Sequence, residues 1–273
     1  MSEILVTVSE LSAALTSPRP PVLLDVRWAL GDPDNRQHYL DAHIPGAVFV
    51  DLGSELAGHA EPTDGRHPLP ALDDLQMHAR RWGIDTDSPV VVYDATGNMA
   101  AARAWWLLRW AGFEPVRMLD GGLGAWQAAE LPTRSGEETA PRTGDVVLSE
   151  GHLPTVTADD AATYPGRLLD ARAGERYRGE VEPVDPRAGH IPGAVSAPTS
   201  DNVTGDGTFA TPDVLRDRFA AMGVRPGDDV AVYCGSGVTA AHEIAALALA
   251  GIDAALFPGS WSAWASDPRR PVE

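Results

Sequence analysis

The strongest constraint on the fold is that the chain repeats itself. Four short blocks of the first half recur in the second half, in the same order and at nearly constant spacing. They are VLLDVRW at 22–28 and RLLDARA at 167–173, HIPGAVFVD at 43–51 and HIPGAVSAP at 190–198, YDATGNMAAAR at 93–103 and YCGSGVTAAHE at 233–243, and LDGGLGAW at 119–126 and FPGSWSAW at 257–264. Chance similarity does not preserve order and spacing together, so the sequence predicts two copies of one domain.

Each copy alternates short apolar runs with helical patterns. The apolar runs are rich in Val, Leu and Tyr and lack polar alternation, which is typical of parallel strands buried on both faces. These runs lie at 22–26, 89–94, 167–171 and 229–234. Helical patterns lie at 71–82, 99–111, 211–222 and 238–250. The alternation predicts an α/β fold with two tandem domains, each a mostly parallel sheet flanked by helices.

A segment rich in Pro, Gly, Thr and charged residues separates the two copies. This composition is typical of a linker that runs over the surface between domains. We therefore expect an N-terminal domain at 1–140, a linker at 141–156 and a C-terminal domain at 157–273.

The composition excludes several classes of function. The formal net charge is −18, from 39 acidic and 21 basic residues, and every basic residue is arginine. A surface this acidic repels nucleic acid and anionic lipid, so neither is an expected partner. No apolar run reaches the length of about 18 residues that a membrane span requires. The N-terminal stretch MSEILVTVSE lacks the basic region of a secretory signal, which favours a cytoplasmic location.

The only cysteine, Cys234, follows an apolar strand and begins the loop CGSGVTA, which leads into a helix. Ligands bind at the carboxyl ends of parallel strands, and two glycines let the loop curl with its N–H groups inward. Together with the positive end of the following helix, this loop favours an anionic sulfur. A small buried apolar cysteine remains the alternative. The repeat favours a reactive thiol, because the matching position in the first copy is Asp94, typical of one working and one inactive site.

These features resemble the rhodanese family over nearly the whole chain: tandem copies, two HIPGA segments, the CGSGVTA loop and a closing GSWSAW. Within that family the loop is similar to that of the 3-mercaptopyruvate sulfurtransferases. Thiosulfate-specific members carry basic residues just after the cysteine, where this chain has Gly235 and Ser236. The resemblance implies a sulfurtransferase that moves a sulfane sulfur from 3-mercaptopyruvate, with thiosulfate a less favoured donor. The sulfur would pass through a Cys234 persulfide to a thiol or cyanide.

The resemblance also implies how the donor and the persulfide are bound. Arg176 and Arg187 match two arginines that clamp the donor's carboxylate, and a forked guanidinium suits that planar group. Solvated surface arginines are the alternative, with Arg178 a replacement if the alignment shifts by one turn. The persulfide would be held by backbone N–H groups of the loop, including those of Gly235, Gly237, Val238 and Thr239.

A proton relay is implied for Ser236, which matches a serine linked to a histidine and an aspartate of the first domain. We assign these two roles to His43 and Asp34. The alternative for His43 is a structural role in the HIPGA turn, since His190 occupies the same position in the second copy.

Partners and alternatives follow from the same residues. With no second cysteine in the chain, the sulfur acceptor must be external, such as a thioredoxin-like protein or a small thiol. The expected chemistry requires a small-molecule sulfur donor and neither a metal nor an organic cofactor. A phosphatase or arsenate reductase would need an arginine in the loop, and residues 235–241 contain none. A non-enzymatic regulatory or sulfur-carrier-binding module stays open.

Overall fold

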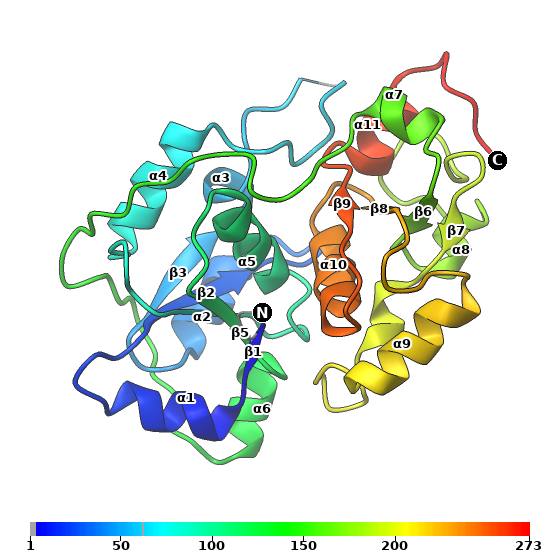
Figure 1. The fold of residues 1–273 in the computed structure, drawn as a ribbon. Coiled ribbons are helices and arrows are strands. Elements are labelled where there is room, and N and C mark those ends of the chain that lie inside the picture. Colours follow the sequence, from blue (N-terminus) through cyan, green and yellow to red (C-terminus); the bar gives the residue numbers. More distant parts are fainter. Residues whose placement is uncertain (1–3, 62) are drawn as a thin grey trace. The chain divides into compact units, whose positions relative to one another are not determined.

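The computed structural model describes residues 4–61 and 63–273, which form two compact units (Figure 1). The first unit comprises the described residues up to Ala57 together with Pro70–His152 and Gly205–Phe209. The second comprises Leu153–Thr204 and Ala210–Glu273, together with the described part of Gly58–Leu69. The division after His152 falls inside the segment expected to be a linker. The assignment of 58–69 to the second unit was not anticipated from the sequence.

The first unit is built on a five-stranded sheet with strand order β1-β5-β4-β2-β3, in which the paired strands run parallel. Its strands are β1 (Leu5–Val6), β2 (Val22–Arg27), β3 (Ala47–Asp51), β4 (Val90–Tyr93) and β5 (Val116–Leu119). Its helices are α1 (Val8–Leu15), α2 (Asn35–Asp41), α3 (Leu52–Glu55), α4 (Leu72–Arg81), α5 (Ala101–Trp110) and α6 (Gly122–Ala128). Helix α5 packs against β2, β4 and β5, and α2 packs against β2 and β3.

The second unit repeats this plan with a four-stranded parallel sheet of order β7-β6-β8-β9. Its strands are β6 (Arg167–Asp170), β7 (Val195–Ser196), β8 (Val230–Tyr233) and β9 (Ala255–Leu256). Its helices are α7 (Ala158–Ala162), α8 (Gly174–Tyr177), η1 (Thr199–Asn202), α9 (Pro212–Ala221), α10 (Thr239–Leu249) and α11 (Ser260–Ser266). The prediction of two parallel sheets flanked by helices is therefore confirmed.

The repeated sequence blocks make the same buried contacts in both units. Asp25 at β2 and Asp170 at β6 are fully buried, and each pairs with the arginine two residues later, Arg27 or Arg172. Each arginine also donates to a carbonyl just before or near the HIPGA turn, at 2.8 and 2.7 Å. A buried charge pair needs such additional hydrogen bonds to offset its desolvation. These aspartates therefore hold the fold in both copies.

The central strands β4 and β8 hold equivalent positions, each paired with the first long strand of its unit. Both consist of fully buried residues, and both end in a buried tyrosine, Tyr93 or Tyr233. The next residues are Asp94 and Cys234, so the two repeat-related positions lie at the carboxyl ends of their sheets. This is the edge at which parallel sheets bind ligands.

The segment expected to be a linker packs along the first unit for most of its length. Gly144 and Val146 donate backbone hydrogen bonds to Arg80 and Ile84 at 2.7 and 3.2 Å. The side chains of Val146 and Leu148 are buried. Hydrogen bonds and buried apolar groups of this kind hold a segment in place without regular secondary structure.

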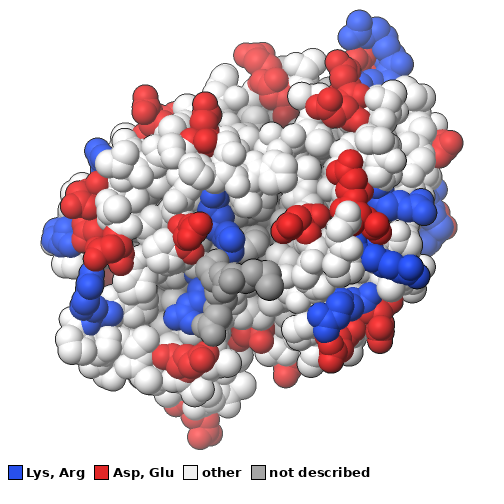
Figure 2. Space-filling view, in the orientation of Figure 1, with Lys and Arg blue, Asp and Glu red and all other residues white. Residues whose placement is uncertain are grey.

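The surface carries charges of both signs. In the view of Figure 2, arginine side chains lie among acidic ones instead of forming one continuous positive patch. Among the described residues, no helix combines the length and apolar character needed to cross a membrane.

Candidate active site

Cys234 lies directly after β8 and only 2% of it is exposed. Its Sγ accepts a hydrogen bond from the N–H of Gly237 at 3.1 Å. Its own backbone is fixed on both sides: the N–H donates to Ser260 Oγ at 3.1 Å, and the carbonyl accepts from the N–H of Trp261 at 3.0 Å. The thiol is therefore held at the carboxyl edge of the sheet by the start of α11.

Two glycines of the loop after Cys234 have different surroundings. At Gly237 φ is +79°, and a Cβ atom there would lie 2.4 Å from the carbonyl oxygen of Pro258. At Gly235 a Cβ atom would crowd two guanidinium groups, described below. The loop then enters α10, with Val238 preceding its first residue, Thr239. The N-terminal end of this helix adds a positive partial charge beside the loop.

The matching loop of the first unit shows what such a loop binds. Asp94 is buried, and its carboxylate accepts hydrogen bonds from four backbone N–H groups. Oδ1 accepts from Thr96 and Asn98, both at 2.8 Å, and Oδ2 accepts from Ala100 and Ala101 at 2.7 and 3.1 Å. The strand-to-helix loop of the repeat can therefore bind an anion with its backbone N–H groups. In the first unit, the bound anion is the carboxylate of Asp94 itself.

Ser236 is buried, and its Oγ lies 2.8 Å from Nδ1 of His67. The histidine within hydrogen-bonding distance of this serine is His67, whereas the sequence analysis assigned the role to His43. It belongs to the 58–69 segment of the second unit. A serine hydroxyl bonded to an imidazole can pass a proton in either direction, because both groups donate and accept.

Two arginines flank the loop at Gly235. A Cβ atom built there would lie 3.2 Å from Nη2 of Arg66 and 3.3 Å from Nη1 of Arg176. Arg176 Nη2 donates to Glu182 at 2.7 Å and lies 3.4 Å from Asp185, which also binds Arg66 Nη1. Nε of Arg176 is buried and has no hydrogen-bond partner within the described part of the chain. An unpaired buried donor beside the cysteine loop is a place for a ligand's oxygen atom.

Arg187, expected as the second arginine of the clamp, has another task. Its guanidinium donates to backbone carbonyls at distances of 2.7 to 3.0 Å, those of Trp264, Ala265, Asp267 and Arg270. These bonds use donors on all three nitrogens and fix the last turn of α11 and the segment after it. The guanidinium of Arg187 is thus engaged by backbone carbonyls, and the arginine that lies with Arg176 beside Gly235 is Arg66. Arg178 is exposed and pairs with Glu180.

The histidines of the two HIPGA turns make equivalent contacts. Nδ1 of His43 bonds to the carbonyl of Tyr39 at 2.9 Å, and its ring stacks on that tyrosine at 4.2 Å. His190 repeats both contacts with Tyr177, at 2.8 and 3.8 Å. A contact made in both copies cannot be specific to one active site. Asp34 is exposed at the start of α2 and makes no side-chain hydrogen bond to the helix end.

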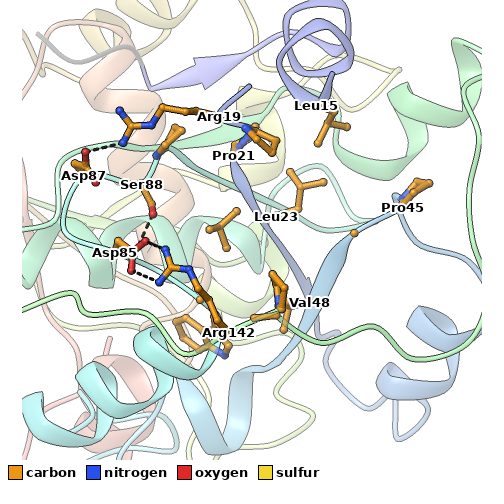
Figure 3. A pocket seen from close by; sticks show the side chains of 18 residues that line it. Leu15, Arg19, Pro21, Leu23, Pro45, Val48, Asp85, Asp87, Ser88 and Arg142 are labelled. Atoms are coloured by element: carbon orange, nitrogen blue, oxygen red, sulfur yellow. Dashed lines mark hydrogen bonds and ion pairs between the residues drawn. The ribbon is translucent and has the colours of Figure 1, made fainter. Parts of the chain in front are cut away.

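A separate cavity of about 590 Å³ lies in the first unit, at the amino-terminal ends of β2 and β4 (Figure 3). Its apolar wall includes Leu15, Leu23 and Val48, and its rim carries the ion pairs Arg19–Asp87 and Arg142–Asp85. Its lining contains no cysteine or histidine, and it lies at the sheet edge opposite to Asp94. The cavity is therefore not the place for the chemistry of a thiol.

Comparison with known families agrees with this geometry. The rhodanese-like domain matches the chain twice, over residues 7–129 and 156–267. This chain belongs to the rhodanese family. The two matches fall on the two copies of the internal repeat, and only the second contains a cysteine. The predicted membership of the rhodanese family is confirmed.

Relatives with curated names cover nearly the whole chain. A putative thiosulfate sulfurtransferase, SseB, of Mycobacterium tuberculosis is 48% identical over 99% of this chain and 96% of its own length. A probable 3-mercaptopyruvate sulfurtransferase of Pseudomonas aeruginosa is also 48% identical, over 98% of this chain and 97% of its own. The crystal structure of the 3-mercaptopyruvate sulfotransferase SseA from Escherichia coli matches with a TM-score of 0.82. It is 33% identical over 95% of this chain and 99% of that chain.

These relatives confirm the prediction of an enzyme of the sulfurtransferase class. Such an enzyme acts on a sulfur donor and a sulfur acceptor. The names of the relatives divide between two donors at equal identity, so the donor has to be argued from the side chains beside Cys234 in this member of the rhodanese family.

Arg66 and His67 were missed by the sequence analysis because the repeat offers no counterpart for them. One signal was present: the first copy has more residues than the second between its HIPGA block and Tyr93. An insertion in one copy that carries an arginine next to a histidine is a candidate for function, since loops supply binding residues to a conserved scaffold.

Proposed function

We propose that this protein transfers sulfur from 3-mercaptopyruvate through a persulfide on Cys234. The observation that carries the proposal is the position of the Cys234 thiol in an anion-binding loop, with Arg66 and Arg176 beside Gly235. Two guanidinium groups suit the donor's carboxylate, and the unpaired Nε of Arg176 offers it a further N–H. Gly235 and Ser236 place no positive side chain directly after the cysteine, where thiosulfate would need one.

The transfer balances without a cofactor. The Cys234 thiolate attacks the sulfur atom of 3-mercaptopyruvate, and a sulfur–sulfur bond forms as the donor's carbon–sulfur bond breaks. The electron pair of the broken bond stays with the methylene carbon, which becomes the enolate of pyruvate. The proton of the donor's thiol moves to that carbon, so the products are pyruvate and a Cys234 persulfide anion.

Ser236 and His67 are proposed to carry this proton. Their Oγ and Nδ1 atoms are 2.8 Å apart, and Ser236 follows Cys234 by two residues on the same loop. A hydroxyl bonded to an imidazole can receive the thiol proton and return it to carbon, while the negative charge of the thiolate passes to the persulfide. The proposal replaces the expected His43 and Asp34 by His67 and names no aspartate.

The persulfide anion is proposed to be stabilised by loop amides. In a cysteine persulfide the outer sulfur lies two bonds from Cβ, as the carboxylate oxygens of an aspartate do. The four N–H groups that bind Asp94 in the first unit correspond, through the repeat, to those of Ser236, Val238, Ala240 and Ala241. The N–H groups of Gly235, Gly237 and Thr239, which the sequence analysis expected to bind the persulfide, lie on the same loop. The N–H of Gly237 bonds to Sγ of Cys234. Fixed amides of this kind stabilise a developing anion at no reorganisation cost.

The acceptor is proposed to be an external thiol, such as that of a thioredoxin-like protein or a small molecule. Cys234 is the only cysteine of these 273 residues, so the chain offers no thiol of its own to resolve the persulfide. A cytoplasmic location is part of the same proposal, because reducing compartments keep both the nucleophile and acceptor thiols in the reduced state.

The test is the intact mass of the reduced protein after exposure to 3-mercaptopyruvate or, separately, to thiosulfate. A gain of about 32 Da on the wild type and none on Cys234→Ser is expected, with release of pyruvate and a faster gain from 3-mercaptopyruvate. His67→Gln should slow pyruvate release by about 10²-fold or more, as loss of a general acid–base group does. No added sulfur from either donor would overturn the proposal and favour a non-enzymatic module.

A further inference from the structure

We propose that the Asp185 carboxylate is an internal competitor of the donor's carboxylate, and that it biases the site towards donors with a single negative charge. The inference rests on the proposed function, because it assigns a role to a residue beside the donor clamp. It starts from one observation: Arg66 and Arg176, called the clamp from here on, are already bound to an acidic side chain of the same unit.

Asp185 bridges the two arginines that flank Gly235. One of its oxygens, Oδ1, binds Nη1 of Arg66, and Oδ2 lies 3.4 Å from Nη2 of Arg176. Only 4% of its side chain is exposed, and burial raises its pKa, while the positive charge of Arg66 opposes this shift. A planar carboxylate between two guanidinium groups is the arrangement that a carboxylate donor would adopt. Asp185 thus contacts the clamp as the donor would.

The clamp cannot avoid this competition by moving Arg66 away, because its backbone is anchored to the cysteine loop. The N–H of Arg66 donates to Ser262 Oγ at 3.1 Å, and the N–H of Ser262 donates to the carbonyl of Gly235 at 2.9 Å. Just before it, Gly65 has φ of +85°, and a Cβ atom there would lie 2.5 Å from the carbonyl oxygen of Gly259. The backbone of Arg66 is therefore fixed, and the donor's carboxylate and Asp185 compete for its guanidinium.

Asp185 itself lies in a short turn that Glu182 closes. Glu182 Oε1 accepts from the N–H groups of Val184 and Asp185 at 3.2 and 3.1 Å, and it also binds Arg176. The turn is bounded by Pro183 and Pro186, outside regular secondary structure, and the Val184 side chain is 44% exposed. Rotation of the Asp185 side chain away from the arginines therefore requires no helix or strand to break.

The charges around the clamp explain the bias between donors. Arg66 and Arg176 contribute two positive charges, and Asp185 and Glu182, each 4% exposed, contribute two negative ones. Glu182 also lies 3.4 Å from Nη1 of Arg172, whose charge is balanced by Asp170. The 3-mercaptopyruvate carboxylate brings one negative charge, and thiosulfate brings two. Because Coulomb energies are larger in a site shielded from water, the buried carboxylates penalise the dianion more than the monoanion.

The experiment compares Asp185→Asn with the wild type by steady-state kinetics on both donors. The amide keeps the size of the side chain and removes its charge. We expect the KM for 3-mercaptopyruvate to fall about tenfold with kcat unchanged, the loss of a competitor worth about 1.4 kcal/mol. The KM for thiosulfate should fall by a larger factor, so the ratio of the two kcat/KM values shifts towards thiosulfate. The matched control is Glu180→Gln, on the same segment but paired with the exposed Arg178, and it should change neither constant.

A rise in the KM for 3-mercaptopyruvate would overturn the inference, since it would make Asp185 a residue that positions the arginines for the donor. An unchanged KM or an unchanged donor ratio would overturn it as well. If Asp185→Asn lowers the melting temperature, the same kinetics can be measured on Asp185→Ser. A measurement without turnover compares the affinity for pyruvate of Cys234→Ser/Asp185→Asn with that of Cys234→Ser, and the double variant should bind pyruvate more tightly. Failure of the wild type to form a persulfide would instead refute the proposed function, so the two failures are distinguishable.

Discussion

At the scale of single residues, the molecule offers an internal comparison between Asp94 and Cys234. Both follow a buried tyrosine at the end of a central strand, and both precede a loop that leads into a helix. Asp94 saturates its loop with four hydrogen bonds from backbone N–H groups. Cys234 Sγ is bonded to the N–H of Gly237 at 3.1 Å. A thiol is smaller and more weakly accepting than a carboxylate, which leaves the second loop capacity for an additional anionic atom.

Cys234→Asp should therefore convert the second loop into a copy of the first. We expect a folded, inactive protein that is more stable than Cys234→Asn by about 1–3 kcal/mol, the usual cost of leaving buried polar groups badly paired. The asparagine is the matched control, because its NH₂ group would oppose the N–H groups of the loop. Thermal unfolding measures the difference, at about 2–4 °C per kcal/mol for a chain of this size. Equal melting temperatures would contradict the equivalence of the two loops.

The same scale explains which site residues sequence reasoning could find. Cys234, Ser236 and Gly237 lie on one loop between a strand and a helix that the local sequence patterns predict. The position of these residues at the end of the sheet therefore follows from the sequence. Arg187 and His43 could not be excluded, because their partners are backbone carbonyls, which carry no sequence signature. A side chain that binds the main chain looks, in sequence, like one that binds a substrate.

At the scale of elements, the periodic segments were predictable. Runs predicted as strands at 89–94 and 229–234 correspond to β4 and β8, and the helical patterns at 99–111 and 238–250 correspond to α5 and α10. Burial on both faces gave these strands continuous apolar runs, which is why they stood out. Periodicity could not reveal that α10 also buries the carboxylate of Glu243, because an apolar pattern predicts only the burial of apolar side chains.

Glu243 on α10 is the clearest case, and it predicts a pH dependence of stability. It is fully buried, bonded to Asn202 Nδ2 at 2.6 Å and paired with Arg218 at 3.3 Å. Burial raises its pKa above the ordinary value of 4.5, although Arg218 opposes this. The folded state thus binds this proton more tightly than the unfolded state, so the associated stability is present below pH 4.5 and is lost as the pH rises through the folded-state pKa.

Glu243→Gln should remove that loss. Chemical denaturation of the two proteins from pH 4.5 upwards should show the wild type losing stability relative to Glu243→Gln, by at most about 1.4 kcal/mol per pH unit. The exposed Glu180 offers a control, because Glu180→Gln removes a carboxylate that is 56% exposed. Parallel pH profiles for the wild type and Glu243→Gln would mean that Arg218 holds the pKa of Glu243 near its ordinary value.

At the scale of the whole molecule, the sequence predicted the tandem plan but not how the chain is shared between its units. A repeat predicts that each copy supplies its own residues. Instead, the described part of 58–69, from the first copy, joins the second unit and brings Arg66 and His67 to the loop of Cys234. The described residues of this segment form neither helix nor strand, so neither periodicity nor the repeat constrains the path of the chain there. Completion of the site therefore depends on a segment far away in sequence.

Gly65→Ala tests this dependence in the full chain. The new Cβ atom would meet the carbonyl oxygen of Gly259 at 2.5 Å and Ser262 Oγ at 2.9 Å, and φ at this position is +85°. Because the segment must shift, the arginine and histidine that follow should leave the loop. We expect the KM for 3-mercaptopyruvate to rise and kcat to fall, while alkylation of Cys234 by iodoacetamide continues, since this neutral reagent needs neither side chain.

Gly31→Ala is the matched control for the same substitution. Gly31 also has a positive φ, +81°, but a Cβ atom there would meet nothing within 4 Å. Both variants carry the strain of a left-handed alanine, a cost of about 1–2 kcal/mol. Gly65→Ala adds the backbone clash and the lost contacts of the shifted segment, so its melting temperature should fall further than that of Gly31→Ala. Only Gly65→Ala should change the kinetics of sulfur transfer. If both variants kept wild-type kinetics, the 58–69 segment would not be part of the catalytic site, and the proposed roles of Arg66 and His67 would have to be abandoned.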